Sequence, residues 1–186
     1  ENYPVQSPTW VVVMQDYGAG ETAPLIESAG SQASFDGAWE GYGPQQFLNY
    51  GRLPGNRFML NWPQQGNDYG VGLNRLIHST SARHGYWQEA KDHSQQFAHF
   101  IQAELGRRYG LAEAVFPDLE GTPGGGSFAL YPYYRESRRL VGVTTVSEPD
   151  IVPVPEGQVA SLPVNDAGVV DAIAIGNYPN DHHYPG

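Results

Sequence analysis

The pattern of apolar and polar positions predicts short strands in the first third of the chain. Residues 9–14, Thr-Trp-Val-Val-Val-Met, are largely β-branched or aromatic, and the turn residues Asp-Tyr-Gly-Ala-Gly follow them directly. Such a run between turn signals is typical of a buried strand. Residues 45–53 predict one further strand, and residues 56–62 alternate well enough to form another that ends at Pro63.

The clearest periodicity in the sequence predicts a long helix over about residues 81–108. Apolar or aromatic residues recur there near the 3.6-residue period of an α-helix, at Tyr86, Ala90, Phe97, Phe100, Ile101 and Leu105. Hydroxyl residues at 79–81 offer N-caps, while Arg107 and Arg108 supply a cationic last turn and Gly110 a stop.

The second half of the chain alternates loops with short apolar runs. Residues 120–127, Glu-Gly-Thr-Pro-Gly-Gly-Gly-Ser, predict a loop, and residues 139–146 and 169–178 predict two buried strands. A proline-rich connecting segment separates these two predicted strands. The sequence therefore predicts an α+β fold in which a mixed β-sheet and one long helix are joined by many Gly/Pro-rich loops.

Composition narrows the class of protein. The chain has 186 residues, which suits one domain or a large piece of one, and its net charge is −10 with a single lysine. A sequence-independent grip on nucleic-acid phosphates needs a broad basic surface, so nucleic acid is excluded as a partner. No apolar stretch approaches the roughly 20 residues that span a bilayer. Because cysteine is absent, disulfides, thiolate zinc sites and thiol nucleophiles are excluded as well.

The amino-acid composition does not decide the cellular compartment of the protein. A chain without cysteine suits the bacterial cytoplasm, and it equally suits a cell-envelope protein that avoids mispaired thiols. The first residue is Glu1 rather than Met, from which we expect processing or a missing upstream part.

Two glycine-rich segments imitate nucleotide-binding motifs without their context. Residues 18–23, Gly-Ala-Gly-Glu-Thr-Ala, follow a predicted strand, but Pro24 interrupts any helix after them. The segment 120–127 lacks the lysine and hydroxyl pair of a phosphate loop. Both segments are interpreted as ordinary turns, and the dinucleotide-binding Rossmann half is predicted to be missing.

Histidines offer two kinds of site. His93 and His99 lie six residues apart, so they do not share a helix face and predict no metal site, and His93 is interpreted as a satisfied core residue. His182 and His183 stand beside Asp181, where an acid next to imidazoles can tune a proton donor or acceptor. A solvated turn is the alternative for that segment.

An arginine cluster precedes the predicted strand 139–146. The cluster consists of Arg135, Arg138 and Arg139 around Glu136. It holds three of the ten cationic side chains of the protein. If the strand is buried, guanidinium groups at its entrance are partly desolvated and need anionic partners. These partners are carboxylates elsewhere in the fold or a bound anion such as a substrate acid or a cofactor pyrophosphate.

The same segment carries a resemblance to a known family. The stretch from Tyr133 to Ile151 and the stretch 171–183, Asp-Ala-Ile-Ala-Ile-Gly-Asn-Tyr-Pro-Asn-Asp-His-His, resemble the FAD-dependent oxidoreductase family of bacterial two-domain flavoproteins. The family carries Arg-Glu-(Ser/Ala)-Arg-Arg-x-x-Gly, then an acid, and later an Asp-x-His turn. The match is specific at the arginine segment and looser elsewhere. Two departures are Val143 and Thr144, where the family usually has an acid and an aromatic residue.

The resemblance implies a function and a set of site residues. It implies hydride transfer from a small-molecule organic substrate to FAD, with Arg135, Arg138 and Arg139 at the flavin or substrate. Asp181 and His183 are implied as the catalytic pair that handles a proton.

The resemblance also implies a partner. The chain resembles only the central, substrate-side portion, as a single domain or a fragment of a larger flavoprotein. We therefore expect the remainder of the polypeptide or another subunit to complete the FAD site. The alternative is a catalytically inactive interaction or scaffold module of a bacterial assembly, for example one in the cell envelope.

Overall fold

The structure is a computed structural model that describes residues 6–30, 33–135 and 164–169. By contact, the chain divides into two units, one of residues 1–137 with 183–186 and one of residues 138–182. In the second unit the described residues form a turn, in which the Gly168 N–H donates to the Asn165 carbonyl at 2.8 Å. The elements below all belong to the first unit.

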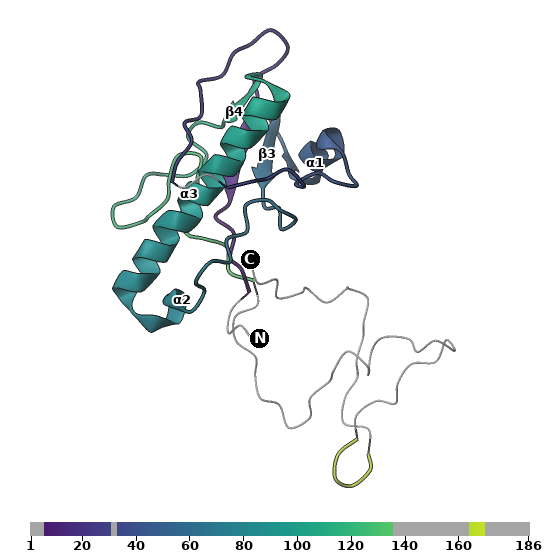
Figure 1. Ribbon diagram of the computed structural model, residues 1–186, viewed down its shortest axis with the longest axis vertical. Helices are drawn as coiled ribbons and strands as arrows, with labels where there is room; N and C mark the ends of the chain where they lie inside the picture. The colour runs from purple at the N-terminus through teal and green to yellow at the C-terminus, as the bar shows by residue number, and fades with distance from the viewer. Residues whose placement is uncertain (1–5, 31–32, 136–163, 170–186) are drawn as a thin grey trace, which may run out of the picture. The chain divides into compact units, whose positions relative to one another are not determined.

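A small sheet forms the centre of the first unit (Figure 1). It consists of β2 (Arg52–Leu53), β3 (Arg57–Leu60), β1 (Val12–Asp16) and β4 (Tyr109–Leu111), in that spatial order. The described strands all pair antiparallel, with Val12 opposite Leu60 and Met14 opposite Leu111. The strands predicted over 9–14 and 56–62 are thus confirmed, with shifted bounds.

The strand predicted over 45–53 is wrong for most of its length. Residues Pro44–Tyr50 form helix α1, and only β2 after it is extended. Proline is well placed at the start of a helix because its fixed φ suits the first turn and its missing N–H is not needed there. Phe47 and Leu48 are both buried in the core, and this tertiary contact decides between helix and strand for a short apolar run.

The long helix is confirmed as α3 (Thr80–Leu105), which crosses one face of the sheet with the short α2 (Arg75–His78) before it (Figure 1). Its N-cap is Ser79, whose hydroxyl accepts a hydrogen bond from the Ala82 N–H at 3.1 Å. The helix ends at Leu105, three residues earlier than predicted, and its C-cap Gly106 has a φ of +94°, in a region that favours glycine.

Residues 127–133 run antiparallel to residues 9–13, which include the start of β1. Tyr133 and Thr9 exchange two backbone hydrogen bonds, and the Ala129 N–H donates to the Val11 carbonyl at 2.9 Å. The Trp10 indole N–H also donates to the Ala129 carbonyl. This pairing brings the last described residues of the first unit beside its first described residues.

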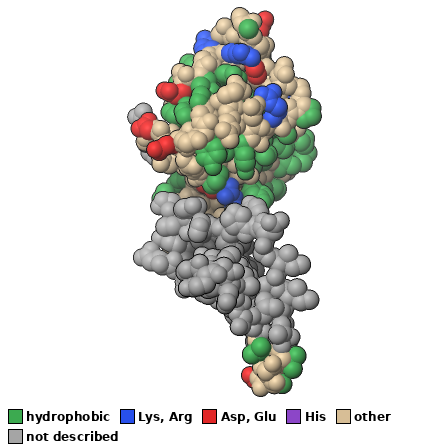
Figure 2. Space-filling view, turned by 90° about the vertical axis from the view of Figure 1, so that its right-hand side faces the viewer, with side chains coloured by type: hydrophobic (Ala, Val, Ile, Leu, Met, Phe, Trp, Pro, Cys, Tyr) green, Lys and Arg blue, Asp and Glu red, His purple; other side chains and the backbone are tan. Residues whose placement is uncertain are grey.

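The core lies between α3 and the sheet and is rich in aromatic rings. Fully buried side chains include Trp10, Met14, Tyr86, Phe97 and Ile101. On the face in Figure 2, hydrophobic side chains also reach the surface in patches between uncharged polar groups. Among the described helices, none is both long and apolar enough to cross a membrane. The α+β class and the single long helix are confirmed.

Candidate ligand-binding cleft

A cleft of about 930 Å³ opens in the first unit between two loops and one face of α3. Its volume falls within the range of roughly 300–1,000 Å³ that is usual for small-molecule sites. The loops lie before α1 and after β3. The lining residues are Ser7, Gly30, Ala33, Ser34, Phe35, Pro63, Gln64, Gln65, Gly66, Asp68, Tyr69, Gly70, Val71, Glu89, Asp92, His93 and Gln96.

The loop after β3 is held in place by the fully buried Asn67. Its side-chain oxygen accepts from the Trp62 N–H at 2.9 Å, and its Nδ2 donates to the carbonyls of Leu60 and Trp10. Nδ2 also lies 3.4 Å from the Ser94 hydroxyl on α3. One amide therefore joins the loop to β3, to the segment just before β1 and to α3, which fixes this wall of the cleft.

The loop before α1 is held by side chains of α3. Gln96 accepts from the Ala33 N–H at 2.9 Å and donates to the Ala29 carbonyl, while His99 Nδ1 lies 2.6 Å from the Ile26 carbonyl. These polar side chains satisfy backbone groups that otherwise lack secondary-structure partners. The opposite wall is thus formed by an irregular segment with defined contacts.

His93 lies on α3 between the two walls. Its Nε2 is 2.9 Å from the Gly66 carbonyl, and its ring packs against those of Phe35 and Tyr69 with centroid distances of 5.2 and 5.4 Å. Burial lowers the pKa of His93 below its ordinary value, so the ring is neutral at pH 7. The interpretation of His93 as a satisfied core residue holds for Nε2, but the ring also lines the cleft.

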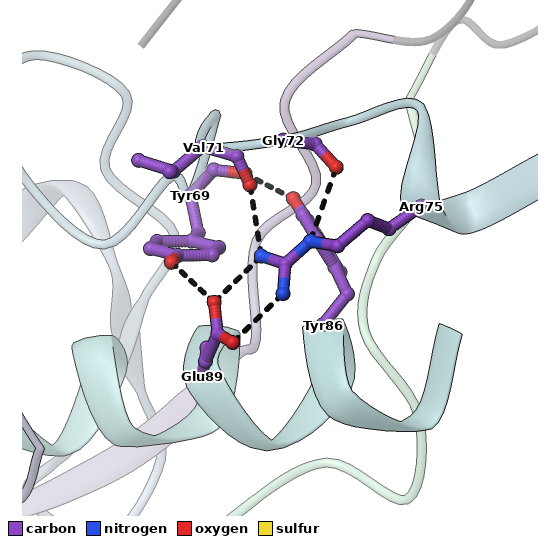
Figure 3. A network of polar contacts seen from close by, with 6 residues as sticks. All are labelled: Tyr69, Val71, Gly72, Arg75, Tyr86 and Glu89. Atoms are coloured by element: carbon purple, nitrogen blue, oxygen red, sulfur yellow. Dashed lines mark hydrogen bonds and ion pairs between the residues drawn. The ribbon is translucent and has the colours of Figure 1, made fainter. Parts of the chain in front are cut away.

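A polar network stands at the rim of the cleft (Figure 3). Arg75 makes two hydrogen bonds to the Glu89 carboxylate, at 2.7 and 2.6 Å, and donates to the carbonyls of Val71 and Gly72. The Tyr69 hydroxyl donates to Glu89 at 2.8 Å. The hydrogen bonds from Arg75 hold the pKa of Glu89 below its usual range, so this carboxylate is ionised and paired.

The first arginine of the arginine cluster is paired with a carboxylate of the cleft. Arg135 Nη1 lies 3.2 Å from Asp68, and its Nη2 donates to the Asn61 side chain at 2.9 Å. Only 13% of the Arg135 side chain and 12% of the Asp68 side chain are exposed. The Thr9 hydroxyl also donates to Asp68. Of the two kinds of anion expected for this cluster, Arg135 has the carboxylate from elsewhere in the fold.

The other predicted site residues lie outside the described residues. These are Arg138, Arg139, Asp181 and His183. Sequence reasoning also did not single out the cleft residues Asp68 and Asp92. The turn-rich stretch 63–70 after a strand was the available signal for Asp68, because binding residues concentrate on loops carried by a rigid scaffold.

The described residues do not form a cradle for the FAD pyrophosphate. Such a cradle needs a glycine-rich turn that leads from a strand directly into a helix N-terminus. Residues 18–23 follow β1 but continue as irregular chain, in which the Ala23 N–H donates to the Arg107 carbonyl. Residues 120–127 likewise form a loop. The interpretation of both segments as ordinary turns is confirmed, and no FAD contact is assigned to the described residues.

The described residues thus form an α+β unit with a cleft whose volume is usual for small-molecule sites. A protein-family model described as FAD dependent oxidoreductase matches residues 3–186, so the chain belongs to that family. This match confirms the resemblance seen at the arginine cluster. Neither the search of curated proteins nor the search of solved structures gave a match.

Proposed function

We propose that this chain is the substrate-binding portion of an FAD-dependent oxidoreductase that transfers a hydride from an organic substrate to the flavin. The observation that carries this proposal is the family match over residues 3–186. The cleft supports it, because its volume falls within the range that is usual for small-molecule sites. FAD would supply the redox chemistry, and this chain would bind and orient the substrate.

Within this proposal the arginine cluster connects the cleft to the cofactor. Arg135 anchors the start of the cluster through Asp68, which lines the cleft. Arg138 and Arg139 follow it closely in sequence, and we assign these two arginines to the flavin or substrate side, with Arg135 as the anchor of the segment. Asp181 and His183 are proposed as the proton-handling pair.

A spectrum of the native full-length protein tests the proposal. We expect a flavin absorption band near ~450 nm that persists through gel filtration and is released by denaturation. Mass spectrometry of the released chromophore should identify FAD. A colourless preparation that stays colourless after incubation with FAD would contradict the proposal and favour a catalytically inactive interaction module.

A further inference from the structure

The charged side chains that line the cleft are largely neutralised within the protein. Glu89 is paired with Arg75, and Asp68 is paired with Arg135. Among the described lining residues there is no lysine or arginine. Asp92 is the remaining carboxylate, and its Oδ1 accepts from Gln88 at 2.8 Å. An anionic ligand would therefore meet no cationic side chain among these residues. Sites for small acids and phosphates usually provide one, most often an arginine.

His93, Gln65 and Asp92 are lining residues that keep hydrogen-bonding capacity toward a ligand. Since the Gly66 carbonyl can only accept, His93 Nε2 carries the ring proton, and Nδ1 is an acceptor without a partner in the described part of the chain. The Gln65 oxygen accepts from the Gly37 N–H at 3.1 Å, which leaves its NH₂ group as an unpaired donor there. Asp92 Oδ2 is a further acceptor.

This mixture of donors and acceptors discriminates between ligand chemistries. A carboxylate only accepts, so it could use the Gln65 NH₂ but not Asp92 or His93 Nδ1. An ammonium only donates, so it could use the two acceptors but not Gln65. A hydroxyl group both donates and accepts, so a ligand with several hydroxyls could satisfy all three groups.

The rest of the lining suits the carbon skeleton of such a ligand. Phe35, Pro63 and Val71 contribute apolar surface, and Tyr69 and His93 contribute rings. Sites of this kind combine apolar walls with a few fixed polar groups that set orientation. His93 is fixed by its hydrogen bond to Gly66 and by two neighbouring rings, and it therefore needs little ordering on binding.

We propose that the cleft binds an uncharged, hydroxyl-rich ligand of the carbohydrate class through Gln65, Asp92 and His93. The proposal rests on the proposed function in so far as this ligand is the substrate of the oxidoreductase. The binding itself is a property of the described residues and does not depend on the flavin.

Ligand-observed NMR on the full-length protein tests the proposal. The probes are neutral methyl glycosides of the common hexoses and pentoses, with glucuronate and glucosamine as charged counterparts of the glucoside. We expect saturation transfer to at least one neutral glycoside and weaker or no transfer to the two charged sugars. Transfer to none of the neutral probes, or stronger binding of a charged counterpart, would overturn the proposal.

Matched variants locate the binding. Asp92→Ala removes an acceptor from the cleft, while Glu104→Ala removes an exposed carboxylate from the same helix. Gln65→Glu keeps the oxygen that accepts from Gly37 but removes the donor, and Gln46→Glu makes the same change at an exposed position of α1. We expect each cleft variant to lower the affinity for the best-binding glycoside about tenfold, which is the effect of one lost hydrogen bond. The control variants should leave this affinity unchanged.

Equal effects of cleft and control variants would overturn the location, and thermal melts verify that each variant is folded. The flavin band of the same sample separates the two proposals. A yellow protein that binds no neutral glycoside contradicts the carbohydrate proposal alone. A colourless protein that binds a glycoside through Asp92 and Gln65 contradicts the oxidoreductase proposal alone.

Discussion

At the residue scale, Asn67 connects its loop to three other segments of the fold. Its amide pairs with the Trp62 N–H and with the carbonyls of Leu60 and Trp10, and every one of these groups is shielded from water. A buried polar group that loses its partner costs far more than an exposed one. The structural role of Asn67 is therefore to make an irregular wall of the cleft stable.

Replacing Asn67 by alanine should destabilise the protein strongly. Several buried donors and acceptors would lose their partner, which we expect to lower the free energy of unfolding by about 2–4 kcal/mol. Denaturant titration measures the loss. Asn74→Ala removes an exposed amide with no side-chain hydrogen bond and should leave the stability nearly unchanged. A loss equal to that control would show that the Asn67 network is not formed.

His93 should make the stability depend on pH. Burial lowers its pKa in the folded state below the ordinary value of 6.5, so the unfolded chain binds the proton more tightly. The stabilisation is complete above the unfolded pKa, and it is lost as the pH falls through 6.5 toward the lower folded pKa.

The matched variant is His93→Gln, which keeps a donor for the Gly66 carbonyl but does not titrate. We expect the stability difference between wild type and this variant to shift in favour of the variant as the pH falls from 8 to about 5. Denaturant titrations at several pH values measure it. A difference that is constant over this range would contradict a lowered pKa.

At the element scale, α3 was predictable because its information is local. An apolar period over more than twenty residues and a serine N-cap specify a helix without reference to the rest of the chain. Helix α1 was not predictable in the same way. Its seven residues are too few to show a period, and contacts of Phe47 with Trp39 and Trp62 decide its conformation.

Gly85 is a weak point of α3 that substitution should repair. It lies exposed inside the helix, and an added Cβ would meet no atom within 4 Å. Gly85→Ala should raise the free energy of unfolding by about 0.5–1 kcal/mol, because alanine loses less backbone freedom on folding. Thermal melting measures the gain. Gly106→Ala is the contrasting variant, since its φ of +94° should make the same change destabilising.

At the scale of the whole molecule, the pair of Arg135 and Asp68 joins positions 67 residues apart in sequence. It fixes the start of the arginine cluster to the loop after β3, next to the pairing of Thr9 with Tyr133. The sequence indicated that Arg135 needs an anion. It could not name Asp68, because only the tertiary fold brings the two segments together.

Asp68→Asn should therefore cost more than loss of an exposed ion pair. Breaking a buried pair costs about 3–5 kcal/mol, and since these side chains keep slight exposure we expect about 2–4 kcal/mol. The control is Asp16→Asn, whose partner Arg108 is exposed and which should produce a clearly smaller loss. Denaturant titration of both variants, with Arg135→Ala for a double-mutant cycle, provides the measurement. Equal losses would indicate that the Asp68 pair is solvated.

The sequence by itself determined the α+β class, the long helix, two strands and the family, because each of these depends on residues that are close in the chain. It also identified His93 and Arg135 as groups that need partners. Only the tertiary structure decided which partners they have and formed the cleft. Its walls come from the loops before α1 and after β3 and from α3, and a cleft built from such distant segments has no local pattern to reveal it.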